Sequence, residues 1–341
     1  MKKNKRYILD YTITQLTGYL NKLGLKSFLA KQIFDWIYKK HKCDFADMTN
    51  ISQQNREILA KEFNILPFSL AEEKISEDES AVKYKFALND GFFIETVILK
   101  EKNYYTCCIS SQAGCSLGCR FCVTGLTGFK RNLKASEIIG QVLFAYTQGY
   151  PISHIVFMGM GEPLLNLDEV LRSINIFTDP LAFNISKRKI TVSTIGILSS
   201  IKRLIEEDLV LNLALSIGSA NPIKRESLIP AEKNNPLLQV INCLSEYQKK
   251  HNRKLTLEYT LIQDHNDSDQ DILELINLAK FLKAKVNLIN LNPHPKINFK
   301  PVTAEKLQNI KNRIAKNNVI VTIRFKKGQD ICAACGQLSA E

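Results

Sequence analysis

The sequence predicts an α/β fold: an open, partial (β/α)6 barrel with a small N-terminal helical domain and a β-hairpin extension. From residue 104 onwards, short apolar runs typical of strands alternate with amphipathic helical segments, and the connections are short. This alternation predicts parallel β/α units. About six such units are too few for a closed eight-stranded barrel, so we expect an open one. Ligands of such sheets bind beyond the carboxyl ends of the strands.

The N-terminal part, residues 1–80, is predicted to be a helical accessory domain. Residues 11–66 have helical character, and the apolar residues 33–38 around Trp36 are followed by Lys39, Lys40 and His41. A second segment, 52–63, carries apolar residues at helical spacing. We interpret the apolar residues as a small core, with the neighbouring basic residues available to a polyanionic partner.

A β-hairpin is predicted at 81–103. The strand-like runs 82–88 and 92–99 flank Asn89-Asp90-Gly91, where glycine can supply a positive φ. Glu95 lies within the second run, between apolar neighbours. A carboxylate in such a run belongs either to the solvent-facing side of the strand or to a site, and the residues alone favour the solvent-facing side.

The barrel is placed at 104–300, and a helix, a strand and a cysteine-bearing tail follow at 301–341. The expected strands are 104–110, 154–158, 189–193, 210–217, 255–262, 286–291 and 319–325. The expected helices are 136–148, 167–178, 198–207, 236–250, 268–283 and 303–316. Ser136 should cap the first helix, whose apolar side chains form one stripe.

Three cysteines, Cys115, Cys119 and Cys122, follow the first predicted strand at the spacing C-x3-C-x2-C. Gly114 and Gly118 let the chain curl, so the thiolates can converge. These soft ligands suit zinc or an iron–sulfur cluster, but structural zinc prefers four ligands. Three cysteines leave one iron of a [4Fe–4S] cluster open to the amino and carboxylate groups of S-adenosylmethionine (SAM). The motif resembles the radical SAM superfamily, and a zinc knuckle or buried thiols are the alternatives.

Polar residues and glycines stand at the ends of several other strands. Gly161 and Glu162 belong to Gly-Met-Gly-Glu-Pro after the second barrel strand, where glycine allows close approach of a ligand and the carboxylate can accept from its amino group. Ser193 and Ser216 end the third and fourth strands, and Asn292 follows the sixth. Taken singly, these three are ordinary strand-end or turn residues.

The composition indicates a protein of a reducing compartment with a polyanionic partner. The 341 residues carry a net charge of +12, spread along the chain, which favours nucleic acid over a merely solvated basic surface. The basic N-terminus is followed by Asp10 rather than by an apolar core, so we expect no signal peptide. No apolar run approaches the ~18 residues of a membrane span. We therefore expect a cytoplasmic protein, in which the nine cysteines serve metal binding or catalysis.

Four stretches together resemble the RlmN/Cfr family of radical SAM methyltransferases, which methylate a ring carbon of adenosine in RNA. They are Cys-Ile-Ser-Ser-Gln-Ala-Gly-Cys at 108–115, Gly-Phe-Lys-Arg-Asn-Leu at 128–133, Phe-Met-Gly-Met-Gly-Glu-Pro-Leu at 157–164 and Ala-Ala-Cys-Gly-Gln-Leu at 333–338. The resemblance covers nearly the whole chain. Region 177–197 leans towards Cfr and region 162–166 towards RlmN.

The resemblance implies a substrate, two cofactors and three catalytic residues. RlmN proteins methylate carbon 2 of an adenosine in 23S ribosomal RNA and also act on transfer RNA, whereas Cfr proteins act at carbon 8; carbon 2 is favoured here. A [4Fe–4S] cluster and SAM are the implied cofactors. Cys335 would carry the methyl group, Glu95 would remove the ring proton, and Cys108 would release the product by forming a transient disulfide. This role for Glu95 replaces the solvent-facing interpretation.

The family's contacts to SAM fall on seven positions of this chain. They are Gly161, Glu162, Ser193, Ser216, Ile217, Gly218 and Asn292. The family usually has Ser-Leu-His where this chain has Ser-Ile-Gly at 216–218, so one histidine contact is missing.

Other expectations concern partners and the remaining cysteines. We expect a monomer that receives electrons from a flavodoxin or ferredoxin. Cys107 and Cys332 are taken as bystanders, with a Cys332–Cys335 redox or metal pair as an alternative. The competing functions are a Cfr-like carbon 8 methyltransferase and a non-catalytic RNA-binding protein with a metal knuckle. The second of these leaves Glu95, Cys108 and Cys335 unexplained.

Overall fold

The computed structural model describes residues 5–324 and 327–339, and its centre is one ten-stranded sheet. The strand order is β14-β13-β12-β11-β10-β9-β6-β5-β4-β3. The strands from β14 to β6 run parallel, whereas β5, β4 and β3 are antiparallel. Because β14 and β3 have one strand neighbour each, the sheet is open, as predicted.

The predicted alternation of strands and helices is confirmed. The parallel strands are β6 (Tyr105–Cys108), β9 (Ile152–Phe157), β10 (Ile190–Thr194), β11 (Asn212–Ser216), β12 (Thr256–Leu261), β13 (Lys285–Asn290) and β14 (Val321–Ile323). The helices between them are α5 (Ala135–Thr147), α6 (Leu167–Thr178), α7 (Leu198–Glu206), α8 (Pro222–Leu228), α9 (Leu237–His251), α10 (Asp269–Phe281) and α11 (Ala304–Lys316). The last predicted strand ended at Phe325, which lies outside the described residues.

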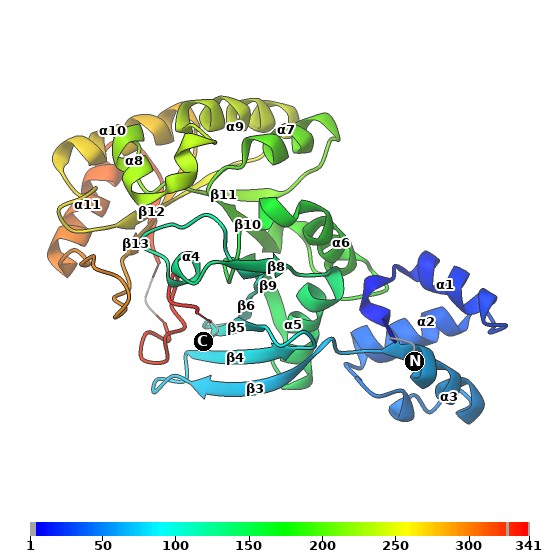
Figure 1. The fold of residues 1–341 in the computed structure, drawn as a ribbon. Helices are drawn as coiled ribbons and strands as arrows, with labels where there is room; N and C mark the ends of the chain where they lie inside the picture. The colour runs from blue at the N-terminus through cyan, green and yellow to red at the C-terminus, as the bar shows by residue number, and fades with distance from the viewer. Residues whose placement is uncertain (1–4, 325–326, 340–341) are drawn as a thin grey trace.

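The helices cover the parallel strands from outside, and the C-terminal tail lies on the inner side (Figure 1). The strands are rich in fully buried branched residues such as Val192, Leu215 and Leu288, as expected of parallel strands covered by helices. The helix α5 differs from the prediction at its start, because its cap is Lys134 and Ser136 lies in the first turn. The Ser136 backbone N–H donates to the Asp10 carboxylate at 2.8 Å, which ties the helix to the N-terminal segment.

The predicted hairpin is present and continues into a third strand. Strands β4 (Ala81–Leu88) and β5 (Phe93–Lys100) pair around a turn in which Gly91 has a φ of 86°. Strand β3 (Phe68–Ile75) pairs with β4, although it lies within the segment 1–80 that was assigned to the helical domain. Only its first residue is buried. An edge strand of this kind lacks the apolar alternation by which strands are recognised.

The N-terminal helices form a separate group beside α5 and α6 (Figure 1). They are α1 (Ile13–Lys22), α2 (Leu29–Phe34) and α3 (Gln53–Glu62), joined by the short parallel pair β1 (Arg6–Tyr7) and β2 (Phe63–Asn64). The apolar residues around Trp36 are buried, as predicted, while Lys40 lies over the Trp36 ring at 3.7 Å. None of the helices in residues 5–324 and 327–339 is long and apolar enough to cross a lipid bilayer.

Candidate active site

The three cysteines of the motif lie in a loop that is fixed at both ends. The loop connects β7 (Gln112–Gly114) to the short helix α4 (Val123–Leu126), and β7 pairs with β8 (Phe129–Asn132). Gly114 has a φ of 75°, and a Cβ atom there would lie 1.9 Å from the Gly128 carbonyl oxygen, so only glycine fits. The Cys115 backbone N–H donates to that carbonyl at 3.1 Å.

A cavity of about 150 Å³ opens between this loop and the carboxyl ends of the strands. It is lined by nine of the predicted site residues: Cys115, Cys119, Cys122, Gly161, Glu162, Ser193, Ser216, Asn292 and Cys335. Ile217 and Gly218 do not line it: Ile217 is fully buried behind Ser216. We refer to this space as the cysteine cavity. The topology therefore brings together residues that are far apart in the sequence.

The three thiols that line the cysteine cavity are soft donors of the kind that hold an iron–sulfur cluster. Within the described residues, no three His, Cys, Asp or Glu side chains come close enough to share one ion. The ligands of a tetrahedral zinc ion must meet at one point, whereas three cysteines of a cluster bind different irons. Burial raises the pKa of Cys115 to about 12 and that of Cys119 well above its usual value. A bound cluster would displace these protons, because metal ligands are thiolates.

Glu162 is held in place by two backbone groups. Its Oε1 atom accepts from the Leu164 N–H and its Oε2 atom from the Ile195 N–H, both at 3.0 Å. Burial raises the pKa of Glu162 to about 7, although these hydrogen bonds oppose the rise. Each carboxylate oxygen has a second lone pair, so the side chain can still accept from the amino group of a ligand.

The backbone and the neighbours of Gly218 disfavour the histidine that the family usually carries. A Cβ atom at this position would lie 2.8 Å from Cδ1 of Ile229, and the φ of 66° disfavours any side chain. The Gly218 carbonyl accepts from the Asn266 side chain at 2.6 Å. The corner of the site beside Ser216 is therefore closed by backbone and by Ile229.

A buried carboxylate that the sequence analysis missed lies at the base of the cysteine cavity. Glu258 on β12 accepts from the Ser193 hydroxyl at 2.7 Å and from the Ser216 hydroxyl at 3.3 Å. It also pairs with Arg324 at 3.7 Å. The available signal was a lone acidic residue inside an apolar strand, the same signal that Glu95 gave.

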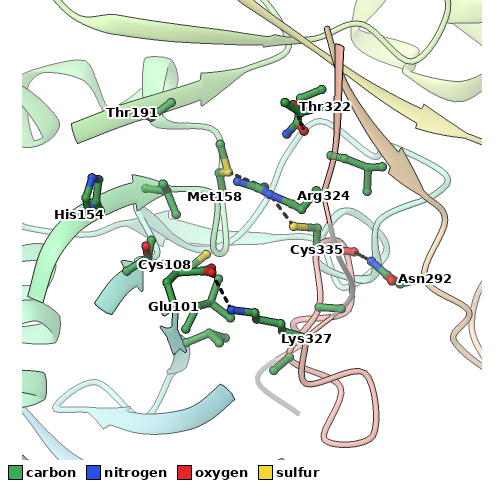
Figure 2. Close-up of a pocket in the computed structure, with 18 of the residues that line it drawn as sticks. Glu101, Cys108, His154, Met158, Thr191, Asn292, Thr322, Arg324, Lys327 and Cys335 are labelled. Carbon is green, nitrogen blue, oxygen red and sulfur yellow. Dashed lines mark hydrogen bonds and ion pairs between the residues drawn. The ribbon is translucent and has the colours of Figure 1, made fainter. Parts of the chain in front are cut away.

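A second cavity, of about 390 Å³, adjoins the first (Figure 2). Its lining includes Cys108, Met158 and Arg324, and it also includes the basic residues Arg188 and Lys189. We refer to it as the outer cavity. It is large enough for a flat ring system and is bordered by positive charge, as a nucleotide requires.

Cys335 lies in the wall between the two cavities and lines both. Its carbonyl accepts from the Asn292 side chain at 3.0 Å. Arg324 donates to the Cys335 sulfur at 3.4 Å and to the Met158 sulfur at 2.9 Å, as Figure 2 shows. Every one of the nine cysteines is a free thiol, so Cys335 forms no disulfide with Cys108 or Cys332.

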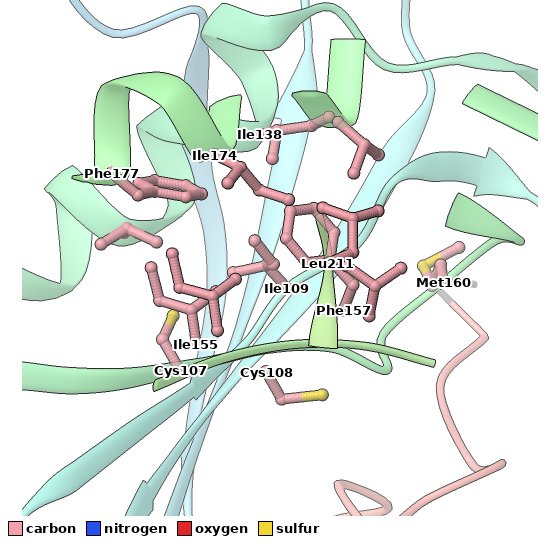
Figure 3. Close-up of a cluster of buried hydrophobic side chains, with 14 of the residues drawn as sticks. Cys107, Cys108, Ile109, Ile138, Ile155, Phe157, Met160, Ile174, Phe177 and Leu211 are labelled. Carbon is pink, nitrogen blue, oxygen red and sulfur yellow. The ribbon is translucent and has the colours of Figure 1, made fainter. Parts of the chain in front are cut away.

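The two adjacent cysteines of β6 face opposite sides of the sheet (Figure 3), as adjacent residues of a strand do. Cys108 points to the outer cavity, and burial raises its pKa to about 12 while Arg324 opposes the rise. Cys107 is fully buried in the apolar cluster beneath α5 and α6. Only Cys108 can therefore reach Cys335 without a change of register.

Glu95 is only 3 % exposed, so the solvent-facing interpretation was wrong. It lines neither cavity. Its Oε1 atom pairs with Lys83 at 3.2 Å, and its Oε2 atom accepts from the backbone N–H of Ser339 at 2.9 Å. Leu338, beside Ser339, does line the outer cavity. The C-terminal tail thus separates Glu95 from the space next to Cys108.

Replacing Arg324 with methionine should slow the reaction of Cys335 with iodoacetamide. The guanidinium stabilises negative charge on the sulfur, and a hydrogen bond to a charged group is worth about 1.5–3 kcal/mol, or roughly ten- to hundredfold in rate. Peptide mapping by mass spectrometry measures the rate at each cysteine. Arg324→Lys should keep most of the rate, and Arg313→Met, which removes an exposed ion pair on α11, should change nothing. If the rate of Cys335 alkylation is unchanged in Arg324→Met, the Arg324 guanidinium does not activate the Cys335 sulfur.

Comparison with known families agrees with this geometry. Residues 7–65 match the model of the ribosomal RNA large subunit methyltransferase N-terminal domain, and residues 109–276 match that of the radical SAM superfamily. The second match contains the cysteine loop and the carboxyl ends of β9, β10, β11 and β12. The N-terminal helices and the sheet with its cysteine loop therefore each have a counterpart in known proteins.

Individual relatives match almost the whole chain. A "probable dual-specificity RNA methyltransferase RlmN" from Pseudothermotoga lettingae is 42 % identical, covering 97 % of this chain and 96 % of its own. One from Aquifex aeolicus is 39 % identical over 98 % and 97 % of the two chains. The crystal structure of a radical SAM methyltransferase from Sphaerobacter thermophilus has a TM-score of 0.94 and 36 % identity, covering 98 % of this chain and 99 % of that one. The chain therefore belongs to the RlmN family of radical SAM RNA methyltransferases.

Proposed function

We propose that this enzyme methylates carbon 2 of an adenosine in 23S ribosomal RNA, with transfer RNA as a second substrate, through a methyl group carried on Cys335. The observation that carries the proposal is the position of Cys335 in the wall shared by the two cavities. A sulfur placed there can receive a methyl group on the side of the cysteine cavity and present it to a base in the outer cavity. The names of the relatives support an RNA substrate.

Each proposed residue has one task. A cluster held by Cys115, Cys119 and Cys122, together with SAM, would supply the methyl group and the radical, and would accept the one electron that remains on the adduct once its ring proton has gone. Glu95 would take the ring proton once the carbon is bonded to the methylene group on Cys335. Cys108 would then bond to the Cys335 sulfur as the sulfur–carbon bond breaks; that bond's electron pair passes to the methylene carbon, which gains a proton and becomes methyl.

The position of the methyl group is tested by mass mapping of modified adenosine. RNA from cells with and without the gene is digested, and 2-methyladenosine and 8-methyladenosine are separated against standards. We expect gene-dependent 2-methyladenosine in ribosomal RNA and in transfer RNA. Gene-dependent 8-methyladenosine would instead show a Cfr-like activity.

The cofactors imply further partners. We infer that a reduced flavodoxin or ferredoxin supplies electrons to the cluster, and that the enzyme works as a monomer in a reducing cytoplasm. The free state of all nine cysteines is compatible with such a compartment. To test which of the two is the electron donor, the enzyme is incubated anaerobically with reduced flavodoxin or reduced ferredoxin, and the 5′-deoxyadenosine formed is measured.

The basic residues at the mouth of the outer cavity should bind RNA phosphates. Arg188 and Lys189 are exposed and also line that cavity. The adjacent residues Lys130 and Arg131 are a further basic pair in the sequence, but Arg131 is engaged by Glu137 and Asp90, so this pair is a weaker candidate. Lys327 pairs with Glu101 at 2.8 Å, and its neighbour Lys326 lies outside the described residues.

RNA affinity should fall steeply as salt rises, because each neutralised phosphate releases counterions. Replacing both Arg188 and Lys189 with alanine should reduce the slope of log affinity against log salt by about 2. Filter binding of a ribosomal RNA fragment at several salt concentrations measures the slope. Alanine at Lys249 and Lys254, exposed residues at the end of α9 and beyond it, should leave it unchanged. An affinity indifferent to salt would rule out phosphate contacts.

A further inference from the structure

Lys83 is a buried lysine to which the reaction described above assigns no role. It is 7 % exposed and belongs to β4, whose register places it opposite Val97 and diagonally across from Glu95. Its Nζ atom pairs with the Glu95 carboxylate at 3.2 Å and donates to the Cys332 carbonyl at 3.2 Å. A buried lysine is costly unless its charge is paired, so both contacts need an explanation.

The C-terminal tail is attached to the β4–β5 hairpin on both sides of Cys335. Before Cys335, the Cys332 carbonyl accepts from Lys83. After it, the Ser339 N–H donates to Glu95. Lys83 and Glu95 therefore form an ion pair that holds the two ends of the tail segment carrying the reactive sulfur.

We propose that Lys83 is the positioning residue for Glu95: it keeps the Glu95 side chain a carboxylate, and therefore a base, when the tail withdraws. The inference rests on the proposed function. Glu95 is cut off from the outer cavity by residues 338 and 339. It can meet a base in that cavity only after the Ser339 contact has been broken, and Lys83 then remains as its partner because it belongs to the adjacent strand.

The step that Lys83 supports is a proton transfer. The ring C–H bond breaks, the proton passes to a Glu95 oxygen, and the bonding pair stays in the ring. A buried carboxylate with no partner would already have taken a proton from water, and a carboxylic acid could not accept the ring proton. Lys83 prevents this without touching the substrate.

The other charged or titratable groups near Glu95 do not replace Lys83. Lys85 stands directly opposite Glu95 in the register, but its Nζ atom lies 4.7 Å from the centre of the Phe93 ring. The tail contributes Cys332 and Cys335, and β6 contributes Cys108. Within the described residues, Lys83 is the cation that forms an ion pair with Glu95.

The test is a denaturing gel with labelled RNA, which shows protein joined to RNA through Cys335. With Cys108 intact, Lys83→Met should accumulate this complex at neutral pH at least roughly tenfold above the wild type, because the adduct forms but keeps its ring proton. Raising the pH should release it, as the carboxyl group of the variant ionises again. Lys83→Arg should behave like the wild type, and Glu95→Gln should accumulate the complex at every pH.

Controls separate this role from a structural one. Lys224→Met removes a lysine on α8 that pairs with buried Asp271 on α10 at 2.8 Å, away from the hairpin, and it should trap nothing. If Lys83→Met is insoluble, Lys83→Gln takes its place with the same expected result. A double Lys83→Met/Glu95→Gln variant should trap no more than Glu95→Gln alone, because both changes affect one group.

Three outcomes would overturn the proposal in distinguishable ways. If Glu95→Gln traps RNA but neither Lys83 variant does, Lys83 has no part in the step and the proposed function stands. If Glu95→Gln also traps nothing and methylation continues, Glu95 is not the base, and both assignments fail. A pH-independent loss of Cys335 methylation in Lys83→Met, without trapped RNA, would show a structural role only.

Discussion

Cys119→Ala should lose its iron, its sulfide and all formation of 5′-deoxyadenosine. Cys119 is 8 % exposed and lines the cysteine cavity with Cys115 and Cys122. With only Cys115 and Cys122 left, the site would offer a cluster one thiolate fewer than the motif provides. Cys335 is the one further cysteine of the described chain that lines the cysteine cavity, and a Cys335 that replaced the lost ligand could no longer carry the methyl group, so activity would be lost in either case.

The measurement is iron and sulfide analysis with an anaerobic absorption spectrum, followed by a 5′-deoxyadenosine assay. Cys243→Ala is the matched control, because Cys243 is a half-buried thiol on α9 far along the chain. It should retain full iron and wild-type activity. Full iron content in Cys119→Ala would mean that the three cysteines do not hold the cluster.

The alternation of strands and helices could be predicted from the sequence because apolar residues recur at different spacings in strands and in amphipathic helices. It held through every unit from β6 to α11. The edge strand β3 was missed for the same physical reason: with one buried residue it carries almost no apolar pattern. The N-cap at Ser136 was displaced because its backbone N–H is satisfied by Asp10, a contact between distant segments.

The candidate site was predictable where a residue type is rare and its spacing is fixed. The three cysteines and the glycines beside them belong to this class. The burial of Glu95 could not be predicted from the residues alone, since a lone carboxylate in a strand gives the same sequence pattern whether it faces water or is buried against Lys83. Arg324 and Glu258 were also missed, because their meeting depends on how β12 and the segment after β14 lie against each other. Local sequence contains no record of such a pairing.

The two catalytic thiols should fail differently when each is replaced. Cys335→Ala has no sulfur to carry the methyl group, so it should transfer nothing to RNA. Cys108→Ala can still be methylated at Cys335 and can still add to adenine. Because it has no thiol to break the thioether, it should remain covalently bound to RNA. Turnover should fall to background in both variants. Only Cys108→Ala should leave a covalent protein–RNA complex on a denaturing gel.

The neighbouring cysteines supply matched controls for this experiment. Cys107 has its side chain in the apolar cluster on the opposite face of β6, so Cys107→Ala should neither trap RNA nor lose product. Cys332 contributes a carbonyl to Lys83, a contact that alanine preserves, so Cys332→Ala should also remain active. If Cys107→Ala traps RNA instead, the register of β6 differs in the working enzyme. If none of the four variants traps RNA, the methyl group does not pass through two thiols, because a thioether between Cys335 and the base requires a second sulfur to release it.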